Sequence, residues 1–529
     1  MTDTHDGVCR IFMTCGTIID KRREQLHMVK TIAEINQKIR NGDVRVVTAE
    51  EMSDIVDEIG AARAAEEVDV VTTGTFGAMC SSGVFLNFGH SETPIKMTKT
   101  WLNNVESYSG LAAVDTYIGA TQLADDNTRD HMTYGGAHVI EDLIRGKEIE
   151  LRAESYTTDC YPRKELTTTI TIDDLNQALM VNPRNAYQRY DAATNGSKKI
   201  IHTYMGELLP EYGNVTYSGA GILSPLTNNP TYRGCGCGTR IFIGGAQGHI
   251  VDQGTQCSSG SGYGTIMTTG NLKEMSSDFV RAAIFDGYGI SLYLGIGIPI
   301  PILDAGMAQA AAVRDKDITV NVKDYSLPIR DRPAIRKVTY EELRSGQIEL
   351  NGRMVPTSSI SSFRKARQIA GILKEWISAG NFLLGDPVDT IPPNLTTKPM
   401  KETQKLPLVG QIMAVPVTIE KTATVTEAAK KMHDCEKNHI PVVSGTHLEG
   451  IITSWDIARA VSENNLQSVE KYMSGNVITC RPEERAEVAA DRMHKAGISS
   501  MPVVDAAGNI LGLITAEDLS RLVTGRVCQ

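Results

Sequence analysis

Cys80 lies in the segment of the chain that is best suited to nucleophilic chemistry. The segment reads Val71-Thr-Thr-Gly-Thr-Phe-Gly-Ala-Met-Cys-Ser-Ser-Gly-Val-Phe-Leu-Asn-Phe-Gly-His90, an apolar run that enters a glycine-spaced turn. Such a turn can direct successive backbone N–H groups at one point, and donors of this kind lower the pKa of a thiol. The pattern predicts that Cys80 is a nucleophile. The alternative is a small cysteine buried in a tight Gly/Ser loop.

A second cysteine, Cys160, lies among positive charges in Ser155-Tyr-Thr-Thr-Asp-Cys-Tyr-Pro-Arg163. Pro162 disfavours helical backbone at the residue before it, so the segment is predicted to be a loop. Nearby cations favour a thiolate, and here they are Arg152, Arg163 and Lys164. Cys160 is therefore a second candidate for a reactive thiol.

Two further cysteines alternate with glycines in Tyr232-Arg-Gly-Cys-Gly-Cys-Gly-Thr-Arg240, and Cys257 follows. A Cys-x-Cys pair can hold a soft metal or a cluster, but four-ligand sites usually show a second well-spaced pair, which the sequence lacks. We interpret Cys235 and Cys237 as small residues between glycines, and a metal or iron–sulfur carrier remains the alternative. The sequence also lacks the P-loop and the glycine motif of dinucleotide-binding folds. It lacks His-Glu-x-x-His as well, which would indicate metal-dependent hydrolysis, and we predict no metal site.

The elements that must position these residues alternate along the chain. Helical patterns are followed by short apolar runs, which predicts an α/β fold for a large Gly-rich N-terminal domain spanning 28–384. The predicted helices cover 31–39, 49–67, 136–144 and 363–378, and the apolar runs include 68–71 and 240–243. Residues 1–27 are predicted to be an N-terminal extension. Five of the chain's 20 prolines fall in residues 385–410, which predicts a Pro-rich linker.

Beyond this linker the sequence repeats itself. His439-Ile-Pro-Val-Val443 returns as Ser500-Met-Pro-Val-Val504, and Gly450-Ile-Ile-Thr-Ser-Trp-Asp-Ile457 returns as Gly512-Leu-Ile-Thr-Ala-Glu-Asp-Leu519. Each copy predicts a strand, a helix such as 426–434 or 485–496, two strands and a closing helix. The repeats resemble a tandem pair of CBS domains, over residues 411–468 and 469–527.

This resemblance implies one pseudo-twofold (Bateman) module that binds an adenosine nucleotide or S-adenosylmethionine and forms a homodimer. The positions that match the ligand-binding motif are Thr453, Asp456, Thr515 and Asp518. A carboxylate at a helix start can accept both ribose hydroxyls, and the preceding threonine can bond a phosphate. The same residues are also ordinary helix caps. Ligand binding and a purely structural role therefore both remain open.

The Cys80 segment continues as Asn87-Phe-Gly-His-Ser-Glu-Thr-Pro-Ile-Lys-Met97 and is similar to the signature of the homocysteine biosynthesis family of anaerobic archaea and bacteria. The stretch from Tyr232 to Gly245 is similar to that family as well, and the similarity spans nearly all of 28–384. It implies L-aspartate semialdehyde sulfurtransferase activity, in which a cysteine persulfide delivers sulfur and L-homocysteine, the precursor of methionine, results. Two cysteines matter in the family, and the matching positions are Cys80 and Cys160.

The residues suit this chemistry. Turning an aldehyde into a thiol requires a sulfur atom and two electrons, and the sequence shows no flavin or nicotinamide motif. Two thiols can take part: one carries the persulfide, the other resolves the sulfur–sulfur bond, and an external reductant resets the disulfide. The resemblance assigns that last role to a ferredoxin-like iron–sulfur partner. A cation for the substrate carboxylate and an acid for the aldehyde are expected near the cysteines. The candidates are His90, Lys96 and Arg163, each of which can equally be an ordinary surface residue.

Composition limits the other classes. The chain has 529 residues with 53 Lys+Arg against 63 Asp+Glu, a formal charge of −10, which excludes a nucleic-acid binder that depends on a global basic field. The sequence shows no signal peptide and no apolar run of about 20 residues, so we predict a cytoplasmic protein. Two alternatives to the enzyme remain: a non-catalytic sensor of an adenosine ligand, and an iron–sulfur or metal carrier.

Overall fold

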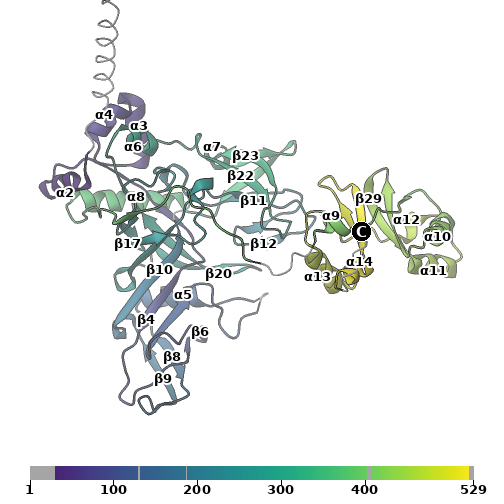
Figure 1. The fold of residues 1–529 in the computed structure, drawn as a ribbon, viewed down its shortest axis with the longest axis horizontal. Coiled ribbons are helices and arrows are strands. Elements are labelled where there is room, and N and C mark those ends of the chain that lie inside the picture. The colour runs from purple at the N-terminus through teal and green to yellow at the C-terminus, as the bar shows by residue number, and fades with distance from the viewer. Residues whose placement is uncertain (1–29, 129–130, 186–187, 402–406, 524–529) are drawn as a thin grey trace, which may run out of the picture. The chain divides into compact units, whose positions relative to one another are not determined.

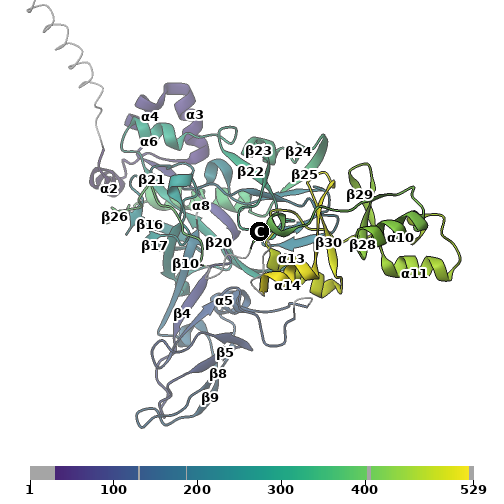
Figure 2. The ribbon, with the colours of Figure 1, turned by 45° about the vertical axis from the view of Figure 1, so that its right-hand side comes forward.

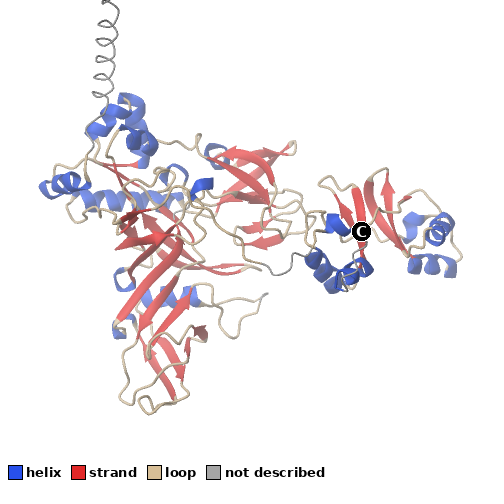
Figure 3. Cartoon of the chain, in the orientation of Figure 1, coloured by secondary structure: helices blue, strands red, loops and turns tan. Residues whose placement is uncertain are grey.

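The computed structural model describes residues 30–128, 131–185, 188–401 and 407–523 (Figure 1). The N-terminal extension predicted for residues 1–27 lies outside the described residues. The chain divides into two compact units, one made of Met1–Lys323 with Ala334–Lys398 and the other of Asp324–Pro333 with Pro399–Gln529. Each unit combines helices and strands (Figure 3), as the predicted α/β class requires.

A nine-stranded sheet forms the centre of the large unit, and all of its pairings are antiparallel. The strands follow the order β19-β20-β16-β17-β18-β10-β4-β7, and β3 pairs with β20. Their bounds are β3 (Thr75–Ala78), β4 (Gly83–Asn87), β7 (Asp115–Gly119), β10 (Gln177–Asn185), β16 (Arg240–Ile243), β17 (Ala246–Gln253), β18 (Ile266–Asn271), β19 (Val280–Phe285) and β20 (Gly289–Gly297). Only four residues separate β3 from β4, yet β3 pairs with β20 whereas β4 pairs with β10 and β7. The segment between them therefore joins two different parts of the sheet.

Helices cover this sheet. The predicted helices at 136–144 and 363–378 are confirmed as α5 (Gly136–Ile144) and α8 (Phe363–Ser378). The pattern at 31–39 is α2 (Ile32–Asn41), whereas that at 49–67 is two helices, α3 (Ala49–Ile59) and α4 (Ala61–Glu67). The break falls at Gly60, whose φ of 79° lies in the left-handed region that favours glycine. No helix within the described ranges has the length and apolarity needed to cross a bilayer.

The α8 helix packs closely on the first strands. A Cβ added at Gly74 would overlap the carbonyl oxygen of Ala366, and one at Gly297 would lie 2.8 Å from Ile369. Small residues therefore let the helix approach β3 and β20. Near α8 a three-stranded sheet joins β1 (Val46–Thr48), β2 (Val70–Thr72) and β21 (Pro299–Pro301), and α6 (Ala305–Ala311) lies against α4.

Three smaller sheets complete the large unit. A four-stranded antiparallel sheet holds β6 (Val105–Ser107), β5 (Lys99–Leu102), β8 (Ile149–Glu154) and β9 (Glu165–Ile170), and it lies at the lower end of this unit in Figures 1 and 2. A six-stranded sheet holds β23 (Ala334–Thr339), β22 (Thr319–Asp324), β11 (Ala192–Thr194), β14 (Val215–Tyr217), β25 (Arg353–Ser359) and β24 (Gln347–Leu350). A short hairpin is formed by β12 (Ile201–Thr203) and β13 (Gly206–Leu208).

The first part of the predicted linker is not free chain. Residues Asp389–Thr390 form β26, which pairs with β15 (Gly236–Cys237). Ile391 is 3% exposed, and the Ser259 hydroxyl donates to the carbonyl of Pro392 at 2.7 Å. Residues 389–395, which include two of the prolines, thus form an extended strap that packs on the large unit, and such a strap needs few backbone N–H donors.

The C-terminal unit contains two interlocked repeats. In the first, β28 (His439–Ser444) and β29 (His447–Thr453) form a hairpin between α10 (Val425–Asp434) and α11 (Ser454–Ser462); in the second, β30 (Ser500–Val504) and β31 (Ile510–Thr515) lie between α13 (Ala486–Ala496) and α14 (Ala516–Val523). Ala414, at the start of the first repeat, bridges to Leu513 in the second, and Ser474, at the start of the second, bridges to Ile451 in the first. This exchange ties the two repeats into one module.

Candidate active site

Cys80 lies in a tight turn between β3 and β4. The Ser82 N–H donates to the Met79 carbonyl at 3.0 Å and closes the turn, and the Ser82 hydroxyl donates to the same oxygen at 2.8 Å. The Met79 N–H donates to Leu292 at 2.7 Å, and the carbonyl of Ser82 accepts from Ala120 at 2.8 Å. Strands on both sides therefore hold the turn, and Cys80 is left exposed.

The exposed thiol opens into a pocket of ≈ 390 Å³. The other lining residues are Ser81, Thr121, Leu123, Arg184, Tyr288, Gly289 and Ile290. The volume suits a small metabolite, since ligand pockets start at about 300 Å³. Arg184 is the lining residue with a permanent charge, and the thiol, the phenol of Tyr288 and the hydroxyls of Ser81 and Thr121 supply the remaining polar groups.

A β-bulge brings Arg184 to the thiol. The register of β10 against β18 shifts between Asn182 and Asn185, and a bulge of this kind re-aims the side chains next to it. The Asn182 amide donates to the Ser82 hydroxyl at 2.7 Å, and the Ser81 hydroxyl donates to the Arg184 carbonyl at 3.3 Å. The bulge and the Cys80 turn are thus bonded to each other.

The electrostatics of the turn differ from the prediction. The pKa of the Cys80 thiol is raised above its ordinary value of 9.0, because loss of surrounding water disfavours the thiolate. The charge of Arg184 and the backbone N–H of Cys80 act in the opposite direction but are the smaller effects. The backbone N–H of the turn thus lowers this pKa as expected, but the loss of water outweighs it, so the predicted net lowering of the pKa is not found. Burial also raises the pKa of Tyr288 to about 12, with the nearby Cys80 as a second cause.

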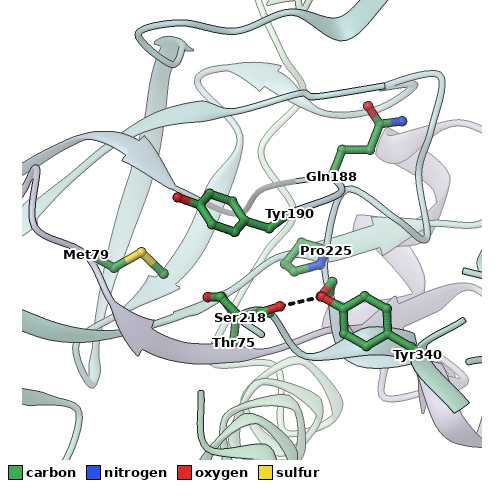
Figure 4. Close-up of a pocket in the computed structure, with 9 residues that line it drawn as sticks. Thr75, Met79, Gln188, Tyr190, Ser218, Pro225 and Tyr340 are labelled. Carbon is green, nitrogen blue, oxygen red and sulfur yellow. Dashed lines mark hydrogen bonds between the residues drawn. The ribbon is translucent and has the colours of Figure 1, made fainter. Parts of the chain in front are cut away.

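A second, smaller cavity of ≈ 20 Å³ has Met79, next to Cys80 in the chain, among its lining residues (Figure 4). Figure 4 shows the Tyr190 ring on one side of it and Ser218 on the other, with the Tyr340 hydroxyl bonded to the Ser218 carbonyl. Its volume corresponds to about one water molecule, so it is too small for an amino-acid substrate. Tyrosine rings link the two cavities: Tyr190 lies 6.3 Å from Tyr204, and Tyr204 lies 6.1 Å from Tyr288.

Cys160 lies in a different place. It is exposed in the loop between β8 and β9, as the sequence predicts. The three residues proposed for substrate binding gather around that loop. The His90 ring stacks on Tyr161 with centroids 6.0 Å apart, Lys96 lies 5.8 Å from the centre of the Tyr156 ring, and the Arg163 N–H donates to Pro94 at 3.3 Å.

Strand β4 separates the two cysteines. Cys80 precedes Gly83 at one end of the strand, where Gly83 pairs with Gly119, and His90 follows Asn87 at the other end, where Asn87 pairs with Asp115. The five extended residues of β4 span about 13 Å and lie between the Cys80 turn and the segment that carries His90. The structure therefore brings His90, Lys96 and Arg163 to Cys160 and not to Cys80.

The Cys235 and Cys237 segment has a structural explanation. Cys235 is buried in the core, where loss of water raises the pKa of its thiol to about 12. Cys237 pairs with Asp389 of the strap, and a Cβ at Gly236 would overlap the Asp389 carbonyl. Across the part of the chain that the structure describes, no three His, Cys, Asp or Glu side chains converge as a metal site would need.

The four CBS positions form two equivalent helix caps. Asp456 accepts from the N–H and hydroxyl of Thr453 at 2.9 and 2.7 Å, and Asp518 accepts from Thr515 at the same two distances. The capping role considered from the sequence is therefore realised in both repeats. In each case the bonds run to one carboxylate oxygen, Oδ2.

Sequence reasoning missed Arg184 and Tyr288. A signal for Arg184 was present, because Pro183 interrupts the strand-like run Gln177–Asn185, and a proline inside a strand often marks a bulge. Tyr288 gave no such signal, since it is one of 17 tyrosines and reaches the pocket through the pairing of β20 with β3.

Comparison with known proteins identifies the family of both units. The model described as homocysteine biosynthesis enzyme, sulfur-incorporation, matches residues 44–384, and the CBS domain model matches residues 409–463 and 469–525. A protein of Methanosarcina acetivorans named L-aspartate semialdehyde sulfurtransferase is 58% identical over 499 residues, which cover 94% of this chain and 99% of that protein. A protein of Methanocaldococcus jannaschii with the same name is 53% identical over 514 residues, which cover 94% and 100%.

Among solved structures, a CBS domain pair crystallised with 5′-methylthioadenosine and S-adenosyl-L-methionine is 40% identical, covers 23% of this chain and 98% of its own, and has a TM-score of 0.22. Family models thus match both units, and two named relatives match almost from end to end. The chain belongs to the homocysteine biosynthesis enzymes that incorporate sulfur, and it carries a C-terminal CBS domain pair.

Proposed function

We propose that this chain is an L-aspartate semialdehyde sulfurtransferase that forms L-homocysteine, with the Cys80 thiol as the sulfur-carrying nucleophile. The observation that carries the proposal is the exposed thiol of Cys80 in a metabolite-sized pocket that also holds an arginine. Two relatives of that name, each more than half identical over almost the whole chain, support the same reaction.

The first step is nucleophilic attack. The Cys80 thiolate takes a sulfane sulfur from a persulfide donor, whose own thiolate leaves, and the outer sulfur of the resulting persulfide lies one S–S bond, about 2.05 Å, beyond the thiol and in the pocket. That sulfur attacks the aldehyde carbon and forms the C–S bond, and the oxygen takes a proton. A second thiolate then attacks Sγ of Cys80, which breaks the S–S bond, forms a disulfide and releases the product sulfur as an α-hydroxythiol.

The electron balance shows that this disulfide does not complete the reaction. Forming the disulfide releases two electrons, which reduce the transferred sulfur to the level of a thiol. The carbon that carries this sulfur still has the oxidation level of an aldehyde. Loss of water gives a thioaldehyde, and two further electrons and two protons give L-homocysteine. Sulfur delivered as a persulfide therefore needs four electrons, and sulfur delivered as sulfide needs two. The two-electron requirement inferred from the sequence is the sulfide case, and an external reductant is needed in both.

The second thiol must come from outside the Cys80 pocket. Cys160 is our candidate, and because its loop lies beyond the far end of β4, its reaction with Cys80 requires movement of that loop or Cys160 of a second copy. His90, Lys96 and Arg163 are then better placed to act on Cys160 than on the aldehyde. We propose a ferredoxin-like iron–sulfur protein of the cytoplasm as the reductant.

The test is an anaerobic assay with L-aspartate semialdehyde, sulfide and a strong reductant. We expect L-homocysteine from the wild type and from Cys435→Ala, a control that removes an exposed cysteine of the other unit. With a persulfide donor, Cys80→Ala should lose at least a hundredfold in rate, because the sulfur-carrying nucleophile is gone, whereas sulfide can attack the aldehyde itself. With a persulfide donor in place of sulfide, Cys160→Ala should fall much further than with sulfide. A Cys80→Ala enzyme with wild-type rates on the persulfide donor would refute the proposal.

We further infer that the CBS pair binds an adenosine ligand and joins two copies of the chain. Support comes from the matching Thr–Asp pairs, in which Oδ2 of each carboxylate bonds the threonine. Oδ1 of Asp518 is left for ribose hydroxyls, whereas Oδ1 of Asp456 also lies 3.7 Å from Arg459. Calorimetry of the full chain with AMP and with S-adenosylmethionine tests this. The double variant Asp456→Asn, Asp518→Asn should bind the ligand at least tenfold more weakly. Wild-type protein that binds neither AMP nor S-adenosylmethionine would overturn the proposal of an adenosine ligand.

A further inference from the structure

We propose that Arg184 binds the carboxylate of the aldehyde substrate and so gives the Cys80 site its preference for small aldehydes that carry an anionic group. This inference rests on the proposed function, because it assigns a role at the same pocket. It names a residue that lies outside both sequence motifs and replaces Lys96, His90 and Arg163 as the substrate's anchor.

Two hydrogen bonds fix the orientation of the Arg184 guanidinium. Its Nε donates to the Thr255 hydroxyl at 3.2 Å, and its Nη1 donates to the side-chain oxygen of Gln256 at 3.1 Å. Within the described parts of the chain, Nη2 donates to no atom. Two fixed nitrogens keep the plane of the group in place, so the third can meet a carboxylate without losing side-chain freedom on binding.

Among the residues that the structure describes, no carboxylate neutralises the charge of Arg184. The described Asp and Glu residues form no ion pair with it, unlike Arg233 or Arg344, which bond Asp304 and Asp315. A cation that faces a pocket and is held by neutral side chains keeps its full attraction for an anion, whereas one already paired with a carboxylate does not. The pocket therefore presents a substrate carboxylate with a guanidinium that is not paired with any described Asp or Glu.

The backbone around Arg184 is arranged to hold it there. The Arg184 N–H donates to the Asn182 side-chain oxygen at 3.1 Å, and the Thr255 N–H donates to the Pro183 carbonyl at 2.8 Å. Gln256, which orients the guanidinium, has a φ of 56°, in the left-handed region that costs a non-glycine residue about 1 kcal/mol or more. Strain of this kind is typical of residues fixed for a function.

The dimensions of the substrate agree with this arrangement. In L-aspartate semialdehyde three C–C bonds of about 1.5 Å separate the carboxyl carbon from the aldehyde carbon. A carboxylate on Arg184 thus leaves the aldehyde about 4 Å further along the pocket, toward the thiol on the same wall. The hydroxyls of Ser81, Thr121 and Tyr288 line the same pocket and can meet the amino group and the aldehyde oxygen.

The first test compares two alkylating reagents on the full chain, with Cys80 modification followed by peptide mass spectrometry. Iodoacetate carries a carboxylate and iodoacetamide does not, so the ratio of their rates measures anion attraction independently of how much thiolate is present. Arg184→Gln should lower the iodoacetate-to-iodoacetamide ratio about three- to tenfold, whereas Arg184→Lys should keep much of it. Arg63→Gln, a change at an exposed arginine of α4, is the control and should keep the wild-type ratio.

The second test uses the enzymatic assay with L-aspartate semialdehyde and with butanal, an uncharged aldehyde of the same carbon number. Arg184→Gln should raise KM for the semialdehyde at least tenfold with a smaller change in kcat, and should slow the reaction with butanal much less, because butanal has no carboxylate to bind and feels only the loss of a charge near Cys80. Equal losses on both aldehydes would overturn the proposal and leave Arg184 a positioning residue. The alkylation ratio does not depend on turnover, so an unchanged ratio refutes the Arg184 proposal and an inactive wild type refutes the proposed function.

Discussion

The bonds between the β10 bulge and the Cys80 turn can be broken at one residue. Asn182 is fully buried; its amide donates to the Ser82 hydroxyl at 2.7 Å and its side-chain oxygen accepts from the Arg184 N–H at 3.1 Å. Asn182→Ala removes both bonds and leaves the Arg184 N–H without its acceptor. It changes neither the nucleophile nor the arginine side chain, so it tests positioning alone.

The expected magnitude follows from these bonds. Each hydrogen bond contributes roughly 1 kcal/mol, and a partly buried N–H left without an acceptor costs roughly 1 kcal/mol or more. We expect the free energy of unfolding of the large unit to fall by about 2 to 3 kcal/mol. Because Arg184 and the Cys80 turn are then free to shift by a fraction of an ångström relative to each other, kcat/KM should fall about ten- to a hundredfold.

The matched control is Asn36→Ala. Asn36 makes two side-chain bonds to Leu384, at 2.9 and 2.8 Å, and it lies on α2, away from the Cys80 pocket. Urea denaturation should show a similar stability loss of roughly 1 to 3 kcal/mol in both variants, whereas only Asn182→Ala should change kcat/KM and the alkylation ratio of Cys80. If both variants keep wild-type kinetics, the bulge does not position Arg184 and the reasoning fails.

Four further predictions follow from the described contacts. Gly371→Ala in the interior of α8 should raise the free energy of unfolding by about 0.5 to 1 kcal/mol, because a Cβ there meets nothing within 4 Å; a thermal melt with a lower midpoint would contradict this. Gly83→Ala should cost about 1 to 3 kcal/mol in the same melt, because its Cβ would overlap the Tyr117 hydroxyl, and Gly475→Ala, with open space around it, should be almost neutral. In native protein at pH 8, iodoacetamide should modify the exposed Cys80, Cys160 and Cys435 and should not modify the buried Cys235, Cys257 and Cys480. Labelling of Cys235 before unfolding would show that this cysteine is not buried in the core. The rate of Cys80 alkylation should still rise with pH above 9, because the thiol pKa is raised, and Arg184→Gln should move the curve to higher pH, because it removes a charge that lowers this pKa; a midpoint near pH 7 would contradict the pocket electrostatics.

Much of the organisation was readable from the sequence because it depends on local patterns. Apolar periodicity predicted α5 and α8 with their exact bounds, although only α8 begins at a capping side chain, that of Ser362. The C-terminal repeats were visible because each copy must build the same hairpin and cap the same helix. Cys80 and Cys160 were recognisable from the residues around them, and both are exposed in loops as expected.

Only the tertiary structure decided which of these residues share a site. Sequence proximity suggested His90 and Lys96 as neighbours of Cys80, but a strand is extended, and the five residues of β4 carry them to its other end. Arg184, about a hundred residues further along, reaches Cys80 because β10 pairs with β4 and bulges at that point. Even the sign of the Cys80 pKa shift depends on tertiary structure, because the loss of water around the thiol is set by residues from several strands, whereas the turn supplies only its own N–H groups.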